Sequence, residues 1–248
     1  MYLDTHAHIL PQYYTDEEIK QIAEQASLQG MHVIINTGLD SITNRQVLYL
    51  HKLYPLLRPA LGYYPLEALK EGADVTHEIA FIRSHAAILA AVGEVGLDYA
   101  YSTEKEQQKA VFAEFIQLAI DLNKPLIVHS RKAEEDCIHM CAKSGYKKIL
   151  FHTFTGNFKL VKEIESHGWY FSVPTSLAYA SHFQELIKRV SLAQIFTETD
   201  CPFMDPDKSE KNVPHNVVQS VGKIAQLKGM DEEEVKRVIF MNYQKVFL

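Results

Sequence analysis

The chain has 248 residues, of which 47% are hydrophobic and 23% are charged, and 25 Lys and Arg against 31 Asp and Glu give a formal net charge of −6. This much apolar surface can offset the loss of chain entropy, which excludes a disordered chain, and three cysteines are too few for a disulfide scaffold. The negative charge argues against a broad duplex-binding face, although a local basic pocket stays compatible with it.

No apolar run reaches the roughly 18 residues that a membrane span needs. Near the N-terminus, Asp4, His6 and His8 interrupt any signal-peptide core. We therefore expect a cytoplasmic protein with reduced cysteines and no membrane association.

Short apolar runs alternate with amphipathic stretches along the whole chain. Such runs are typical of parallel strands that are buried on both faces, because these strands lose the alternation of inward and outward side chains. In chain order, the predicted strands are residues 2–5, 33–36, 58–62, 90–95, 125–129, 148–152, 170–173 and 194–197.

Three helices between and after these strands have clear start and stop signals. Residues 15–18 and residues 103–106 both have the sequence of a capping box, which predicts a helix start at each. Gly30 and Pro125 stand where these two helices should end. A last helix is predicted to begin at Asp231.

Eight strands, each followed by a helix, predict an α/β fold of the (β/α)8 TIM-barrel type, with residues 1–248 as a single domain. A doubly wound open sheet is the alternative on pattern alone. That fold would place a glycine-rich phosphate-binding turn after the first strand, where residues 4–9 contain no glycine. We therefore favour the barrel and expect no dinucleotide cofactor.

Six residues of metal-ligand type fall at the carboxyl ends of the predicted strands. In a barrel these ends all face one rim, where active sites are built. The six are His6, His8, Glu94, His129, His152 and Asp200. His6 and His8 are two apart in an extended segment, so both side chains point to one side. Four imidazoles and two carboxylates exceed the needs of one four-coordinate ion and suit a pair of divalent ions.

The two carboxylates have different expected roles in such a site. Glu94 is the best candidate for a bridge, because its strand lies between the two groups of histidines. Asp200 is either a general base that takes a proton from the attacking water or the N-cap of a helix, and the sequence leaves both open. Zn, Mg and Mn all fit mixed imidazole and carboxylate ligands, so the ions stay unidentified.

Several segments that contain these residues resemble the signature segments of the TatD family of metal-dependent deoxyribonucleases, in the amidohydrolase superfamily. They follow in order along the whole chain: Asp4-Thr5-His6-Ala7-His8, Gly93-Glu94-Val95-Gly96-Leu97-Asp98-Tyr99, His129-Ser130-Arg131, His152-Thr153-Phe154-Thr155-Gly156, Glu198-Thr199-Asp200-Cys201-Pro202 and Asn212-Val213-Pro214-His215-Asn216. The resemblance implies a (β/α)8 barrel, two divalent ions and hydrolysis of phosphodiester bonds, typically from a DNA 3′ end.

The resemblance also implies a role for each residue. His6 and His8 would bind one ion together with Asp200. His129 and His152 would bind the second ion, and Glu94 would bridge the two. Arg131 would hold a non-bridging phosphate oxygen, a task that suits the bidentate geometry of a guanidinium.

The chain departs from the family pattern at two positions. Where the family usually shows Gly-x-His-Pro, this chain has Tyr64 in place of the histidine, and Val213 stands where the tail motif commonly has Glu. Tyr64 is still expected to contact substrate, because a phenol donates a hydrogen bond, but it is not a cation at neutral pH. This departure puts the efficiency of nuclease action in doubt.

Three functions remain open from the sequence. The first is a nuclease of DNA ends that works as a 3′–5′ exonuclease. The second keeps the ions and cleaves a carboxylic ester or amide, as a D-aminoacyl-tRNA deacylase would. The third is a metal-dependent interaction module without catalysis. No obligate protein partner can be read from the sequence.

Overall fold

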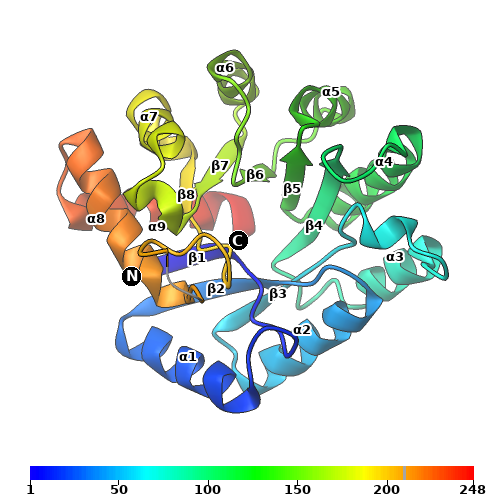
Figure 1. Ribbon diagram of the computed structural model, residues 1–248, viewed down its shortest axis with the longest axis horizontal. Coiled ribbons are helices and arrows are strands. Elements are labelled where there is room, and N and C mark those ends of the chain that lie inside the picture. Colours follow the sequence, from blue (N-terminus) through cyan, green and yellow to red (C-terminus); the bar gives the residue numbers. More distant parts are fainter. Residues whose placement is uncertain (209–210) are drawn as a thin grey trace.

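The computed structural model describes residues 1–208 and 211–248, and it consists of a ring of parallel strands inside a ring of helices (Figure 1). The eight strands form one sheet in chain order. Their bounds are β1 (Tyr2–Ala7), β2 (Met31–Thr37), β3 (Leu57–Leu61), β4 (Ala91–Asp98), β5 (Leu126–Arg131), β6 (Ile149–His152), β7 (Tyr170–Val173) and β8 (Ile195–Thr197). Each strand pairs in parallel with the next.

The helices alternate with the strands and cover the outer surface of the sheet (Figure 1). They are α1 (Asp16–Leu28), α2 (Ser41–Leu53), α3 (Val75–Ser84), α4 (Lys105–Leu122), α5 (Glu134–Ser144), α6 (Phe158–Ser166), α7 (Ser181–Arg189), α8 (Val217–Lys228) and α9 (Glu232–Phe247). The predicted (β/α)8 barrel is confirmed. Within the residues that the structure describes, no helix has both the length and the apolar character to cross a membrane.

Side-chain hydrogen bonds join the last strand to the first. The hydroxyl of Thr5 donates to the carbonyl oxygen of Thr197 at 3.1 Å. The hydroxyl of Thr197 donates to the carbonyl oxygen of Leu3 at 2.6 Å. These bonds link β8 to β1, so the sheet is a nearly closed barrel. Its carboxyl ends therefore face one common rim.

The observed strands lie where the apolar runs predict them, but four of them, β1, β2, β4 and β5, extend further at their carboxyl ends. β1 continues to Ala7 and β4 continues to Asp98, whereas the apolar patterns end at residues 5 and 95. As a result, His6 lies inside β1 rather than just beyond it, whereas Glu94 lies inside its strand as predicted.

The helix signals of the sequence are confirmed in two places and wrong in one. The predicted capping box at the start of α1 is present, and the side chain of Asp231 accepts a hydrogen bond from the first turn of α9. The predicted box at residues 103–106 does not form, because α4 begins at Lys105 with Glu104 as a cap without a side-chain bond. A tight turn, in which Ser102 accepts from the backbone N–H of Glu104 at 3.1 Å, takes its place.

Candidate metal centre

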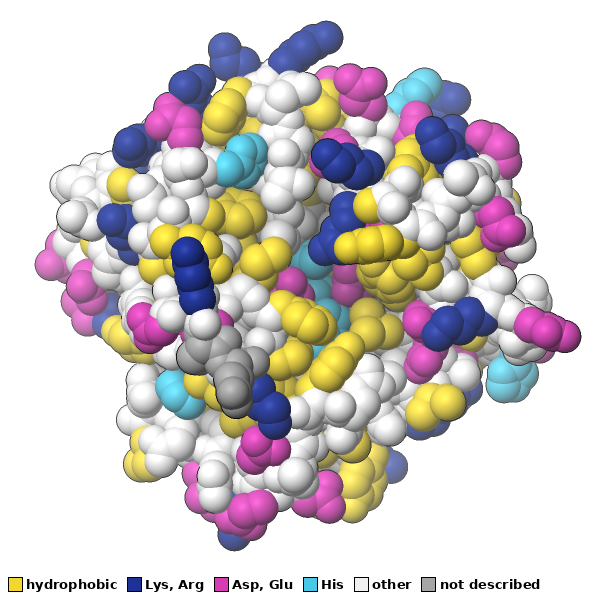
Figure 2. Space-filling model, viewed as in Figure 1, with side chains coloured by type: hydrophobic (Ala, Val, Ile, Leu, Met, Phe, Trp, Pro, Cys, Tyr) yellow, Lys and Arg dark blue, Asp and Glu magenta, His cyan; other side chains and the backbone are white. Residues whose placement is uncertain are grey.

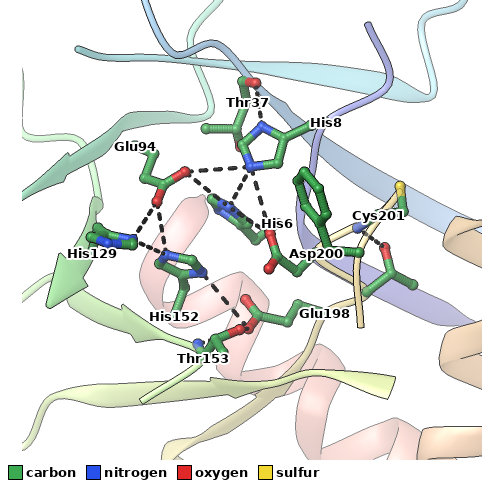
Figure 3. A network of polar contacts seen from close by, with 12 residues as sticks. His6, His8, Thr37, Glu94, His129, His152, Thr153, Glu198, Asp200 and Cys201 are labelled. Carbon is green, nitrogen blue, oxygen red and sulfur yellow. Dashed lines mark hydrogen bonds and ion pairs between the residues drawn. The ribbon is translucent and has the colours of Figure 1, made fainter. Parts of the chain in front are cut away.

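The six predicted ligand residues come together at the bottom of a cavity on the carboxyl-end rim (Figure 3). They form two groups whose ligand atoms lie close together: His6, His8 and Asp200, and Glu94, His129 and His152. Four of them lie in strands: His6 in β1, Glu94 in β4, His129 in β5 and His152 at the end of β6. His8 follows β1 directly, and Asp200 follows β8. All six side chains are largely buried.

The first group has two imidazoles that face one carboxylate. The Nε2 atoms of His6 and His8 are 3.1 Å apart. Oδ1 of Asp200 lies 3.6 Å from each of these nitrogens. Oε2 of Glu94 lies 3.4 Å from each of them, so this carboxylate also faces the first group.

The second group uses the other oxygen of Glu94. Oε1 of Glu94 lies 2.7 Å from Nδ1 of His129 and 3.0 Å from Nε2 of His152. These two nitrogens are 3.2 Å apart. One carboxylate therefore presents one oxygen to each group, which is the geometry of a bridging ligand.

The donor set of both groups fits a divalent cation. Ligand atoms about 2.0–2.2 Å from one ion lie about 3–3.6 Å from each other. The separations in the first group and two of those in the second fall in this range, and Nδ1 of His129 and Oε1 of Glu94 are closer, at 2.7 Å. Each group also has a close contact between two imidazole nitrogens. If hydrogen bonds alone held the groups together, one nitrogen of each contact would have to carry a proton. A cation instead accepts the lone pairs of all these atoms at once.

Hydrogen bonds on the far side of two rings turn the other nitrogen toward the centre. Nδ1 of His8 lies 3.0 Å from the carbonyl oxygen of Thr37, and Nε2 of His129 lies 3.2 Å from Oδ2 of Asp98. A carbonyl and a carboxylate only accept, so these ring nitrogens carry the protons, and Nε2 of His8 and Nδ1 of His129 keep free lone pairs.

Burial and neighbouring charges shift the pKa values of Glu94 and His152 in opposite directions. Burial alone would raise the pKa of Glu94, but the charge of His152 and hydrogen bonds from the imidazoles hold that pKa well below its usual value. Burial would likewise lower the pKa of His152, but Glu94 raises it to about 9. Glu94 is therefore ionised and ready to bind a cation.

Asp200 does not cap a helix, so this alternative from the sequence is wrong. Its backbone N–H donates to the carbonyl oxygen of His6 at 2.9 Å, and its own carbonyl accepts from the N–H of Phe203 in a turn. Its φ of 54° is left-handed. Because burial raises the pKa of Asp200, its carboxylate is more basic than one in water.

Two acidic residues of the site were missed by the sequence reasoning. Asp98, at the end of β4, accepts from the hydroxyl of Tyr64 at 2.7 Å as well as from His129. Glu198 accepts from the N–H and the hydroxyl of Thr153 at 2.8 and 2.6 Å, and burial raises its pKa to about 7. Both stand near strand ends, which is the signal that found the other ligands.

The two residues predicted to bind substrate line the cavity above the centre, which has a volume of about 550 Å³. Arg131 is exposed at the rim. Tyr64 also lines the cavity, and its hydroxyl donates a hydrogen bond to Asp98. Burial and Asp98 raise the pKa of Tyr64, so this side chain is a neutral phenol. Val213, the second departure from the family pattern, packs at the edge of an apolar cluster that contains Cys201.

Comparison with known proteins identifies the family of the chain. Residues 3–248 match the model of the family described as TatD related DNase. An uncharacterised metal-dependent hydrolase of Methanocaldococcus jannaschii is 32% identical, over 99% of this chain and 96% of its own length. The Homo sapiens protein named Deoxyribonuclease TATDN3 is 31% identical, over 99% of this chain and 94% of its own.

Solved structures share the fold. The crystal structure of YJJV, a TatD homologue from Escherichia coli K12, superposes with a TM-score of 0.89 at 22% identity, and 99% of this chain and 97% of that chain are covered. A TatD family hydrolase of Entamoeba histolytica superposes with a TM-score of 0.88 at 18% identity, over 100% and 98% of the two chains. The resemblance seen in the motifs is thus confirmed, and the chain belongs to the TatD related DNase family.

Proposed function

We propose that this protein hydrolyses phosphodiester bonds at the end of a DNA strand with two divalent ions, Zn, Mg or Mn. The observation that carries the proposal is Glu94, which presents one oxygen to each of two ligand groups at the bottom of an open cavity. Two-ion sites of this kind serve displacements at phosphorus. The name of the human relative, a deoxyribonuclease, supports the same substrate class.

The residues of the chain divide the work as follows. One ion would be held by His6, His8 and Asp200. The other would be held by His129 and His152, and Glu94 would bind both ions. When bound, the ions lower the pKa of water toward neutrality and withdraw charge from the phosphate.

Two further groups act on water and phosphate. Asp200 orients the attacking water and accepts its proton, a role that its raised pKa supports. Arg131 holds the non-bridging oxygens from the rim and stabilises the charge that grows on them.

The wall of the cavity supports a nucleotide rather than a bare phosphate ester. Tyr13 and Phe203 line the cavity with their rings edge to face, 5.6 Å between centroids. Leu39 and Met204 add further apolar surface. A nucleobase can lie on such a wall while its phosphate reaches the ions and Arg131.

We also propose that the protein works in the reducing cytoplasm. All three cysteines are free and buried, and burial raises the pKa of each thiol, which makes them inert structural groups rather than disulfide partners.

A substrate panel with metal analysis tests the nuclease proposal. We expect a purified, metal-loaded sample to shorten 5′-labelled single-stranded DNA from its 3′ end, with less activity as salt rises, because phosphate contacts release counterions. Asp200→Asn should lower kcat about 100-fold or more while metal stays bound. Turnover of a D-aminoacyl-tRNA ester without DNA cleavage would favour the deacylase instead. A loaded protein without any turnover would favour the interaction module.

A further inference from the structure

A second cavity, shallow and largely open, has a volume of about 750 Å³. It is lined by two segments of the rim: Leu66, Leu69 and Lys70 after β3, and residues 99–104 after β4. The same segment after β3 lines the first cavity with Tyr64 and Glu67. Neighbouring residues of one segment therefore face the two cavities.

Arg131 and Tyr101 form a second link between the cavities. Arg131 lines the first cavity, and its guanidinium lies 5.6 Å from the ring centroid of Tyr101, which lines the second. In the part of the chain that the structure describes, neither Arg131 nor the adjacent Lys132 forms an ion pair with a carboxylate. Figure 2 shows basic and hydrophobic side chains together at the mouth of the central hollow in which histidines are visible.

Tyr101 has the features of a stacking platform. Its side chain is 69% exposed, although it stands only three residues from the buried Asp98. The segment is anchored at Asp98, whose Oδ1 accepts from the N–H of Ala100 at 2.9 Å, and at Tyr99, whose hydroxyl donates to Asp136 at 2.7 Å. An exposed ring on an anchored segment loses little conformational entropy when a ligand stacks on it.

We propose that the second cavity holds the penultimate nucleotide of a single-stranded nucleic acid whose end lies in the metal centre, with its base on Tyr101 and with Arg131 at the phosphate that joins it to the end nucleotide. This inference rests on the proposed function. Single-stranded nucleic acids bind where aromatic rings and unpaired cations alternate along a groove, and such binding is tolerant of sequence. Here the ring and the cations lie on one continuous rim, on a protein whose net charge is −6.

The test compares Tyr101→Ala with Tyr49→Ala. Tyr49 is 61% exposed on α2, so its variant makes the same chemical change on a surface that lines neither cavity. Metal-loaded proteins are assayed on a thymidine octamer and on bis(p-nitrophenyl) phosphate, which has one phosphate and no further nucleotide. Loss of one base stack should raise KM for the octamer about 5- to 10-fold relative to KM for the small ester. Tyr101→Trp should restore it, and Tyr49→Ala should leave both values unchanged.

Equal KM ratios for Tyr101→Ala and Tyr49→Ala would overturn the inference and leave the nuclease proposal standing. If the unaltered protein hydrolyses neither substrate, the nuclease proposal fails instead. Fluorescence anisotropy of a labelled thymidine octamer then still decides the role of the second cavity. Weaker binding by Tyr101→Ala alone supports that role, and equal binding by both variants refutes it.

Discussion

Asp98→Asn should weaken metal binding although Asp98 belongs to neither ligand group. Asp98 is fully buried, and its Oδ2 atom accepts from Nε2 of His129 at 3.2 Å and from the hydroxyl of Tyr64 at 2.7 Å. The amide removes the negative charge that holds the proton of His129 on Nε2. Substitution of such an outer partner costs about 10- to 100-fold in metal affinity, or about 1.4–2.7 kcal/mol. Competition titration with a chromophoric chelator measures the change.

Tyr64→Phe is the matched control for this variant. It removes the 2.7 Å hydrogen bond from the same carboxylate oxygen but leaves the contact between Asp98 and His129. Loss of one hydrogen bond of this kind should lower metal affinity by no more than about 10-fold. If Asp98→Asn binds metal within about 2-fold of the unaltered protein, Asp98 does not orient His129, and the assignment of that ring is wrong.

Two predictions concern stability. Removal of metal with a chelator should lower Tm by about 5 °C or more, because ions that bind only the native state stabilise it by mass action; an unchanged Tm in differential scanning calorimetry would argue against tight ion binding. Gly96→Ala should cost about 2–4 kcal/mol in urea unfolding, because its Cβ would lie 2.0 Å from the carbonyl oxygen of His129. Gly72→Ala, also at positive φ but with open space around it, should cost clearly less, and equal losses would refute the steric argument.

The sequence predicts the barrel well because its signals are local. Parallel strands covered on both faces are apolar runs wherever they occur, and β7 (Tyr170–Val173) coincides with its predicted run to the residue. The six ligand residues could also be predicted from the sequence, because a barrel places every strand end on one rim.

The hydrogen-bond partners in the site could not be predicted from the sequence, because they depend on which side chains meet in the folded protein. Asp98 stands at a strand end like the ligands, but only the pairing of β4 with β5 brings it to Nε2 of His129. The capping box at residues 103–106 failed for a similar reason, because the turn at Ser102 leads the chain into α4 at a later residue. Tyr64 matched the expected position on the rim, yet its partner, Asp98, is fixed by tertiary packing.

The hydroxyl bonds between β8 and β1 join the last strand to the first, so the ligand group at His6 and His8 draws on both ends of the barrel. Glu94, His129 and His152 are all present once the ribosome has passed residue 152, whereas the group at His6 and His8 waits for Asp200 and for the last strand to dock against the first. A nascent or truncated chain that ends before Asp200 therefore lacks one ligand of the group at His6 and His8. Hydrolysis by a two-ion centre would thus be withheld until the chain is almost fully made.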